Sequence, residues 1–266
     1  MDKKPIYKRV VLELSGEMMK GNLSETTPLP PQPPTPSPLS KGGRGLSGKG
    51  DKNHLISFDF LNDLSTELAE LQNSGVELGI VVGGGNIWRG ASVQEIEQAT
   101  SHQIGMLATV INALALQSAL NRQGISSYIA STIDVKPMVE LCSHHQVIKR
   151  LEQKEIVIFA GGTGQPFFTT DTGAALWALK IQADVILKAT KVDGVYSSDP
   201  FIDKNARKYT QISYNEAIQK ELRVMDLTAF SLCKEYQLPI IVFKLTPSGN
   251  IKRIIFGENI GTIISM

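Results

Sequence analysis

The segment 156–171, which reads Ile-Val-Ile-Phe-Ala-Gly-Gly-Thr-Gly-Gln-Pro-Phe-Phe-Thr-Thr-Asp, constrains the fold of this chain more than any other. Its apolar, largely β-branched start predicts a strand buried on both faces of a parallel sheet. The glycines then allow close approach of the backbone to a ligand, and a strong helix-forming segment begins at Ala174. A strand that leads through such a loop into a helix N-terminus predicts an anion site. An ordinary turn with capping threonines has the same composition.

A second strand and glycine loop lie earlier in the chain. Residues 78–82, Leu-Gly-Ile-Val-Val, predict another buried strand, which runs directly into Gly83, Gly84 and Gly85. Arg89 follows four residues later, where its guanidinium can neutralise a phosphate. A lone glycine triplet is weak evidence, but the two loops together predict phosphate binding.

Apolar strands and amphipathic helices alternate along most of the chain. Further strands are predicted at 9–14, 185–189, 239–243 and 261–264, and helices at 59–74, 104–123, 147–151 and 227–236. This alternation predicts an α/β fold with a doubly wound sheet and helices on both faces. With 266 residues and 42% hydrophobic content, residues 1–266 are expected to form one domain.

Residues 22–53 interrupt this pattern. The stretch 28–38 is mostly proline, and 41–52 is glycine with basic residues, so we predict a disordered insert that joins no core. Its Pro-x-x-Pro spacing could bind an SH3 domain, but a plain spacer is favoured. Gly43, Gly48 and Lys49 match most of a P-loop pattern, yet Gly50 replaces the required hydroxyl residue and no strand precedes them.

Charge and apolar content exclude several classes of protein. The net charge of +1 carries no electrostatic footprint of a nucleic-acid partner. No apolar run approaches the about 18 residues of a membrane span, and the first residues lack a signal-peptide core, so a cytoplasmic protein is expected. Cys142 and Cys233 are expected to be buried thiols in a reducing compartment. His144 and His145 are interpreted as surface residues rather than metal ligands.

The order of residues in the two glycine loops, and in the string from Thr190 to Pro200, resembles that of bacterial uridylate (UMP) kinases, which are members of the amino-acid-kinase family. The resemblance covers 7–264 apart from the insert. It implies a three-layer αβα sandwich of the carbamate-kinase-like type, with a mostly parallel central sheet, and a homohexamer. It also implies transfer of a phosphoryl group from Mg-ATP to UMP, giving UDP and ADP in pyrimidine nucleotide biosynthesis. Mg²⁺ would be held through phosphates and water, and GTP and UTP would be effectors.

The same resemblance implies roles for individual residues. The UMP-binding positions would be Gly84, His102, Thr163, Gly164, Gln165, Pro166, Phe167, Phe168, Thr169 and Thr170. The ATP-binding positions would be Leu14, Ser15, Gly16, Gly85, Arg89, Thr190, Tyr196 and Asp199. The catalytic positions would be Arg89, Asp171, Asp226 and Glu13.

Two of these positions depart from the family. Glu13 stands where the family has a lysine among the transferring phosphates, and His102 stands where it has an aspartate on the UMP ribose. Lys8, Lys188 or Lys191 could neutralise Glu13, and Lys188 is favoured because its strand should run parallel to the first.

Three hypotheses about function follow. The first is a UMP kinase that is slowed by Glu13, and the second is a catalytically inactive nucleotide-binding paralogue with a regulatory or structural role. The third, an amino-acid kinase acting on a carboxylate such as glutamate or aspartate, is disfavoured by the string Gly-Gln-Pro-Phe-Phe-Thr-Thr-Asp.

Overall fold

Eight strands form one sheet at the centre of the computed structural model, which describes residues 4–20, 54–89, 95–222 and 224–266. In order across the sheet the strands are β3 (Ser127–Ser131), β4 (Ile156–Ala160), β2 (Glu77–Val82), β1 (Arg9–Leu14), β5 (Val185–Thr190), β7 (Ile240–Lys244), β8 (Thr262–Ser265) and β6 (Gln211–Ser213). All neighbours are parallel except β7 and β8. The predicted insert at 22–53 lies outside the described residues.

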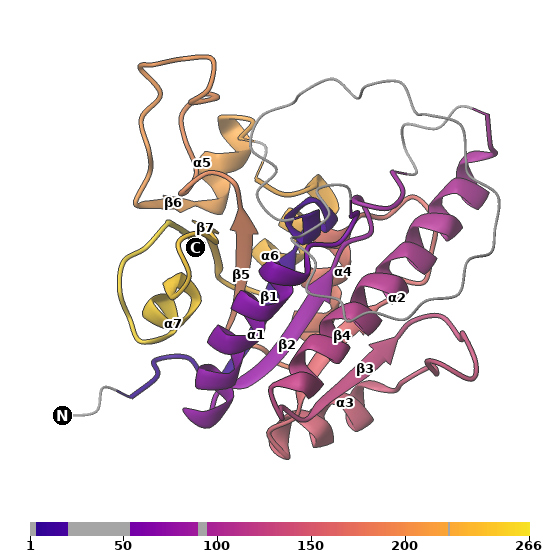
Figure 1. Cartoon of the computed structure of the whole chain (residues 1–266). Helices are drawn as coiled ribbons and strands as arrows, with labels where there is room; N and C mark the ends of the chain where they lie inside the picture. Colours follow the sequence, from indigo (N-terminus) through magenta and orange to yellow (C-terminus); the bar gives the residue numbers. More distant parts are fainter. Residues whose placement is uncertain (1–3, 21–53, 90–94, 223) are drawn as a thin grey trace, which may run out of the picture.

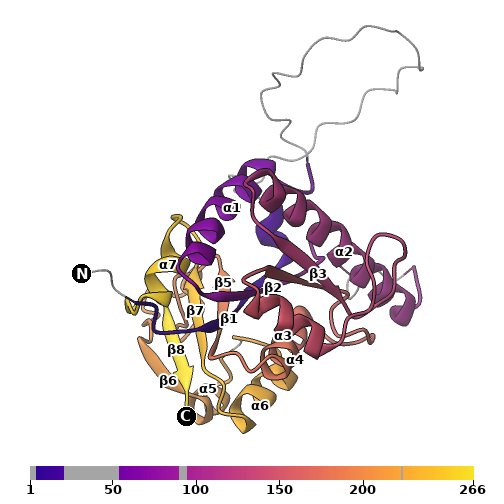
Figure 2. The same ribbon diagram turned by 90° about the horizontal axis from the view of Figure 1, so that it is seen from below.

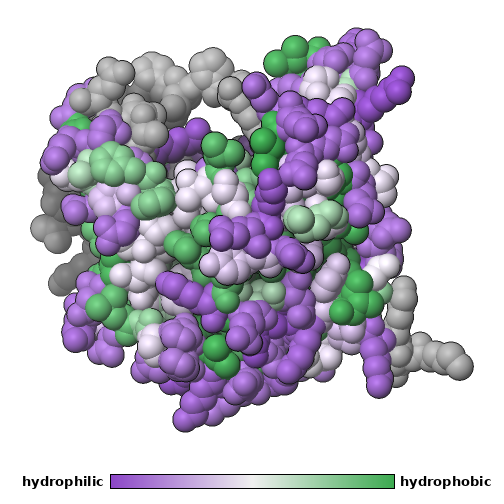
Figure 3. Space-filling view, turned by 180° about the vertical axis from the view of Figure 1, so that it is seen from behind, coloured by the Kyte–Doolittle hydropathy of each residue, from purple (hydrophilic) through white to green (hydrophobic). Residues whose placement is uncertain are grey.

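Helices cover both faces of this sheet, which confirms the predicted three-layer αβα fold (Figures 1 and 2). One face packs against α1 (Phe58–Asn73), α2 (Gln98–Arg122) and α7 (Asn250–Ile255). The other packs against α3 (His144–Glu152), α4 (Thr170–Lys180), α5 (Tyr214–Gln219) and α6 (Leu227–Glu235). Seen from behind the view of Figure 1, polar and apolar side chains are interspersed over the outer surface (Figure 3).

Strand β1 shows how the sequence distributes its side chains between the two layers. Val10, Leu12 and Leu14 enter the apolar cluster on the α1 side, whereas Val11 enters the cluster on the α4 side. Because side chains alternate along a strand, Glu13 lies on the same face as Val11, beneath α4. A charged residue thereby occupies a buried position in the central layer.

Helix α2 differs from its predicted boundaries. It begins at Gln98 rather than residue 104. The prediction missed its first turns because they are polar and carry no apolar periodicity. His102 therefore lies inside the helix and not before it. Among its apolar residues, Leu107 is 46% exposed, while Val110 and Leu116 are buried.

The length and apolar composition of α2 would suit a membrane span, and 44% of its apolar window is buried inside the fold. The helix packs on α1 and contributes Val110, Ala113 and Leu116 to the core beside the sheet. This packing accounts for the buried part of its apolar surface, while Leu107 and Ile111 are exposed.

Two shorter helices also begin before their first apolar residue, because polar side chains cap them. Thr169 caps α4, and its hydroxyl accepts hydrogen bonds from the backbone N–H groups of Asp171 and Thr172. Ser143 and Gln146 form a capping box at the start of α3. Both starts lie upstream of the boundaries predicted from apolar spacing.

The structure tests the predictions made for two histidines and two cysteines. His144 and His145 are exposed, as predicted, and the described residues contain no group of three or more potential metal-ligating side chains. Cys233 is buried, but Cys142 is only half-buried, so the prediction of two buried thiols was wrong for Cys142. Cys142 directly precedes the exposed cap of α3, where the chain runs along the surface.

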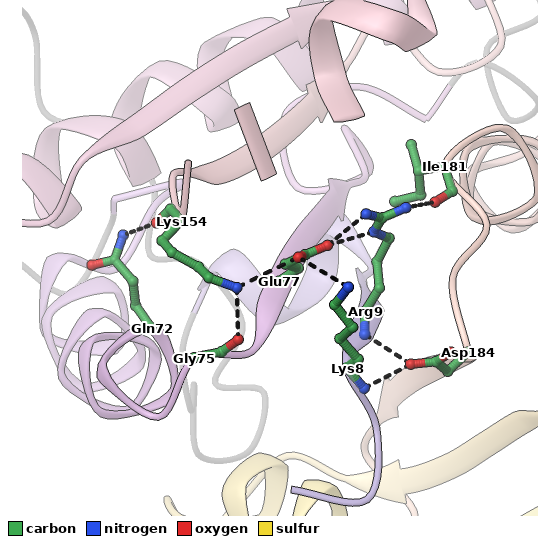
Figure 4. Close-up of polar contacts among 8 residues, drawn as sticks. All are labelled: Lys8, Arg9, Gln72, Gly75, Glu77, Lys154, Ile181 and Asp184. Atoms are coloured by element: carbon green, nitrogen blue, oxygen red, sulfur yellow. Dashed lines mark hydrogen bonds and ion pairs between the residues drawn. The ribbon is translucent and has the colours of Figure 1, made fainter. Parts of the chain in front are cut away.

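A buried ion-pair network closes the end of the sheet where the central strands begin (Figure 4). Glu77, 2% exposed, lies 2.7 Å from the Arg9 guanidinium, 3.4 Å from Lys154 Nζ and 3.9 Å from Lys8 Nζ. The Asp184 carboxylate accepts hydrogen bonds from the backbone N–H groups of Lys8 and Arg9, at 2.7 and 2.8 Å. The network ties the starts of β1 and β2 to the turns that precede β4 and β5.

Candidate active site

The loops that follow β1, β2, β4 and β5 meet at the carboxyl edge of the sheet, because these strands are neighbours in the order β4-β2-β1-β5. The loops after β1 and β2 touch so closely that side chains are excluded. A Cβ added to Gly16 would lie 2.3 Å from the backbone N of Gly85, and one added to Gly83 would lie 2.7 Å from the N of Gly16. Glycine is therefore required at both positions.

A cavity of about 510 Å³ opens between the loop after β2, the first turns of α2 and the loop after β4. Its volume lies within the range of about 300–1,000 Å³ that is usual for small-molecule sites. Of the predicted site residues, it is lined by Gly84, Gly85, Arg89, His102, Thr163, Gln165, Phe168, Thr169 and Thr170. A second cavity of about 60 Å³, beside Ile263, is too small for a nucleotide.

Three predicted UMP-binding residues, Gly164, Pro166 and Phe167, lie in the same loop but do not line the cavity. Phe167 adopts a left-handed φ of 71°, which is uncommon for a residue other than glycine, and its side chain is 68% exposed. Its ring centre lies 5.2 Å from that of His102. The loop therefore turns outward at Phe167, whose ring lies against His102, a residue of the cavity wall.

A buried ion-pair centre lies where β1, β5 and the start of α4 meet. Parallel pairing sets Glu13 opposite Lys188, and Lys188 Nζ lies 3.0 Å from Glu13 Oε2. Lys188 also donates a hydrogen bond to Asp171 Oδ1, while Asp171 Oδ2 accepts one from the backbone N–H of Asp226 at 3.1 Å. Of the three lysines considered from the sequence, the structure selects Lys188.

Burial sets the protonation of this centre. It raises the pKa of Glu13 to about 7, because the loss of water and the nearby Asp171 outweigh the attraction of Lys188. Burial alone would lower the pKa of Lys188, but the two carboxylates beside it outweigh burial and raise that pKa. Lys188 therefore remains a cation, and Glu13 titrates near neutral pH.

Asp226 links this centre to the cavity. It caps the N-terminus of α6, where its Oδ1 accepts a hydrogen bond from the Ala229 N–H at 2.9 Å. Its Oδ2 accepts hydrogen bonds from the hydroxyls of Thr169 and Thr172. Burial acts to raise the pKa of Asp226, but these hydrogen bonds outweigh it and hold the pKa below its usual value. Because Thr169 also lines the cavity, the ion-pair centre and the cavity share one wall.

Arg89 stands at the mouth of the cavity with its charge partly offset. Its Nη2 lies 2.7 Å from Glu17 Oε1, and Glu17 is also 3.3 Å from Lys20 Nζ. The Arg89 side chain is mostly exposed. Glu17 therefore pairs with part of the guanidinium, and that part would otherwise be available to a phosphate.

The predicted ATP-binding residues after β5 mainly shape their own loop. The Thr190 hydroxyl donates to the Val192 carbonyl at 2.6 Å, and the Tyr196 hydroxyl donates to Asp193 at 2.6 Å. Asp199 Oδ1 accepts a hydrogen bond from the backbone N–H of the second residue after it, at 2.9 Å. Leu14 ends β1, and Ser15 and Gly16 follow it next to the glycine loop, all three outside the cavity lining.

Trp88, Met106 and Thr109 line the cavity but were not predicted as site residues. Lys188 was predicted only as a neighbour of Glu13. The sequence carried a signal for Lys188, since a lysine inside an otherwise apolar buried strand requires a partner. Thr109 sits in the apolar middle part of α2, and nothing in its spacing marks it as a site residue.

Comparisons with known proteins agree with this geometry. Residues 39–244 match the amino acid kinase family. A uridylate kinase from Parabacteroides distasonis is 42% identical over 260 residues, which cover 97% of this chain and 98% of that protein.

Solved structures give the same result. A UMP kinase from Bacillus anthracis aligns with a TM-score of 0.82 at 31% identity, covering 97% of this chain and 96% of the other. One from Ureaplasma parvum aligns with a TM-score of 0.80 at 32% identity over 100% of both chains. The chain therefore belongs to the amino acid kinase family, among the bacterial uridylate kinases.

Proposed function

We propose that this protein transfers the γ-phosphoryl group of Mg-ATP to UMP and releases UDP and ADP, a step of pyrimidine nucleotide biosynthesis. The observation that carries the proposal is the shared wall between the 510 Å³ cavity and the centre formed by Lys188, Asp171 and Asp226. An acceptor phosphate in the cavity would lie beside the buried cation. The likeness to uridylate kinases supports UMP as the acceptor.

The chain would catalyse this reaction by positioning its substrates and offsetting charge, since in-line phosphoryl transfer needs little covalent help from a protein. Backbone N–H groups of the two glycine loops and the Arg89 guanidinium would hold the acceptor phosphate. Lys188 would stabilise charge on the transferring group, and Asp171 would hold the lysine in place. The loop from Thr190 to Asp199 would receive the adenosine.

Mg²⁺ fits this site as an ion carried by the phosphates. Both carboxylate oxygens of Asp171 and both of Asp226 already accept hydrogen bonds, so they suit contact through water better than direct ligation. When bound, Mg²⁺ offsets the negative charge of the triphosphate. Asp171 and Asp226 would orient its water ligands.

We expect Glu13 to slow the reaction. It places a carboxylate where the family has a lysine, and it also pairs with Lys188 at 3.0 Å. Losing one electrostatic contact of this kind typically costs about 10²–10³ in rate. The same pairing favours the alternative function, a nucleotide-binding paralogue that no longer catalyses and acts in regulation or assembly.

The remaining properties rest on other grounds. A homohexamer and GTP and UTP as effectors rest on the family resemblance. A cytoplasmic location without a nucleic-acid or membrane partner rests on the charge and apolar content of the sequence. Light scattering of the purified chain, with and without GTP or UTP, measures the assembly and its response.

The test is ADP release in a coupled assay with UMP, with CMP and with no acceptor. We expect turnover that depends on UMP, with Arg89→Ala raising KM for UMP. Calorimetry on the same samples separates the two functions. UMP binding without turnover identifies the inactive paralogue, and absence of heat with both UMP and ATP at millimolar concentration would overturn the site itself.

A further inference from the structure

We infer that Thr109 and Asn112, one turn apart on the inner side of α2, are positioning residues that set the distance between the two glycine loops. This inference rests on the proposed function, because that distance matters only if both loops hold a nucleotide. Each residue forms a hydrogen bond with the backbone of a different loop. Neither is expected to touch the reacting atoms.

Asn112 holds the loop after β2. It is fully buried, and its Nδ2 donates to the Gly83 carbonyl at 2.7 Å. It also forms a reciprocal amide pair with Asn86, with hydrogen bonds of 3.0 Å and 2.7 Å. Asn86 Nδ2 in turn donates to the Leu55 carbonyl at 2.9 Å. The glycine loop is therefore fixed at its first residue and again just after its last, in a buried network whose polar groups are paired.

Thr109 holds the loop after β4. Its Oγ1 accepts a hydrogen bond from the Gly161 N–H at 2.7 Å and donates to the Met106 carbonyl at 2.7 Å. Gly161 begins the left-handed turn of that loop, with a φ of 79°. Without the Thr109 hydroxyl this buried N–H would lose its partner, and a buried unpaired N–H is costly.

The backbone of α2 closes the remaining space. A Cβ added to Gly84 would lie 2.6 Å from the Gly105 carbonyl oxygen and 2.9 Å from the Ala108 Cβ. The loop after β2 thus rests directly on the helix, and Thr109 reaches the other loop from the same turn. Because a helix is rigid over one turn, the two loops cannot move apart without breaking one of these contacts.

Steady-state kinetics and calorimetry on four variants test the inference. Thr109→Val keeps the shape but removes the hydroxyl, and Thr109→Ser keeps the hydroxyl. Asn112→Leu removes the bond to Gly83. Asn250→Leu is the matched control, since Asn250 is also buried but donates a hydrogen bond to the Lys244 carbonyl at 2.9 Å, from the start of α7.

We expect Thr109→Val to raise KM for UMP about tenfold and to leave KM for ATP within about twofold, because the loop after β4 lines only the acceptor cavity. Thr109→Ser should restore wild-type KM. Asn112→Leu should raise both KM values, since Gly84 and Gly85 lie on the loop that it holds. Asn250→Leu should lower the unfolding midpoint and leave both KM values unchanged.

Failure of the positioning role and failure of the proposed function give different results. If wild type turns over UMP and a folded Thr109→Val, or Thr109→Ala should Val not fold, keeps wild-type KM for UMP, the positioning role is wrong and the proposed function stands. If wild type does not turn over UMP, the proposed function fails, and Kd for UMP from calorimetry decides the positioning role by the same pattern. If wild type does not bind UMP either, both are wrong.

Discussion

The chain buries a glutamate at each end of its central strands, and the two have opposite surroundings. Glu77, at the start of β2, lies within ion-pair distance of Arg9, Lys154 and Lys8 (Figure 4). Glu13, near the end of β1, has Lys188 as its ion-pair partner and shares that lysine with Asp171. Cations outnumber carboxylates in the first group, and carboxylates outnumber cations in the second.

This difference separates the structural end of the sheet from the functional one. A buried carboxylate is tolerated where nearby cations compensate for its lost hydration, as around Glu77. At the other end the carboxylate is under-compensated, and its pKa rises to about 7 for that reason. Perturbed groups of this kind gather at functional sites. Four predictions sharpen the comparison, from the largest expected effect to the smallest.

Arg9→Met should lower the free energy of unfolding by about 3–5 kcal/mol, because it removes the closest partner of a buried carboxylate. Urea unfolding followed by circular dichroism measures the change. Lys8→Met is the control: Lys8 is 77% exposed and 3.9 Å away, so it should cost less than about 1 kcal/mol. Equal losses in the two variants would show that Glu77 does not depend on its nearest cation.

Lys188→Met should lower kcat for UMP phosphorylation by about 10²–10³, since the buried cation beside the cavity is lost. The matched control, Lys154→Met, removes a lysine from the Glu77 group and should leave kcat unchanged. A Lys188→Met enzyme with wild-type kcat would mean that the ion-pair centre is purely structural.

Glu13→Lys should raise kcat by at least about tenfold, because it restores a cation at this position and releases Lys188 from its carboxylate partner. Glu13→Gln separates the two effects, since it removes the negative charge without adding a positive one. We expect it to fall between wild type and Glu13→Lys. Wild-type turnover already in the ordinary kinase range of about 1–100 s⁻¹ would contradict the view that Glu13 slows the reaction.

Glu13 should also make stability and rate depend on pH. A carboxyl whose pKa rises from 4.5 unfolded to about 7 folded favours the folded state less as pH increases across that window, because ionising it in the core is costly. Glu13→Gln should therefore gain stability relative to wild type between pH 5 and about 8. The kcat of wild type should fall over the same interval, while that of Glu13→Gln should stay flat. A constant difference between the two proteins would place the Glu13 pKa outside this range.

The sequence alone predicted the layers of the fold because local patterns set them. Apolar β-branched runs followed by glycine loops marked β2 and β4, whereas the edge strands β3 and β6 and the helix α7 were not predicted. The boundaries that failed include those set by capping residues, such as the start of α4 at Thr170 and of α3 at His144. Caps act through single hydrogen bonds, which apolar spacing does not report.

Part of the cavity lining lies in the two loops that the sequence marked. Gly84, Gly85, Arg89 and Thr170 line the cavity, and their roles in binding stay predictions. Residues contributed by other elements were not found, and Thr109 is the example. Its hydroxyl matters because α2 crosses beside Gly161, a contact between residues 52 positions apart in the chain.

The partner of Glu13 marks the boundary between what sequence and tertiary structure determine. The sequence offered three lysines and favoured Lys188 on the expectation of parallel strands. Only the strand order and register decided the matter, since they place Lys188 directly opposite Glu13 and carry Lys8 to the far end of the sheet beside Glu77. The sequence specifies which side chain can carry a charge. The pKa and the role of that side chain depend on which groups the fold brings within a few ångströms. Here the contact joins residues 175 positions apart.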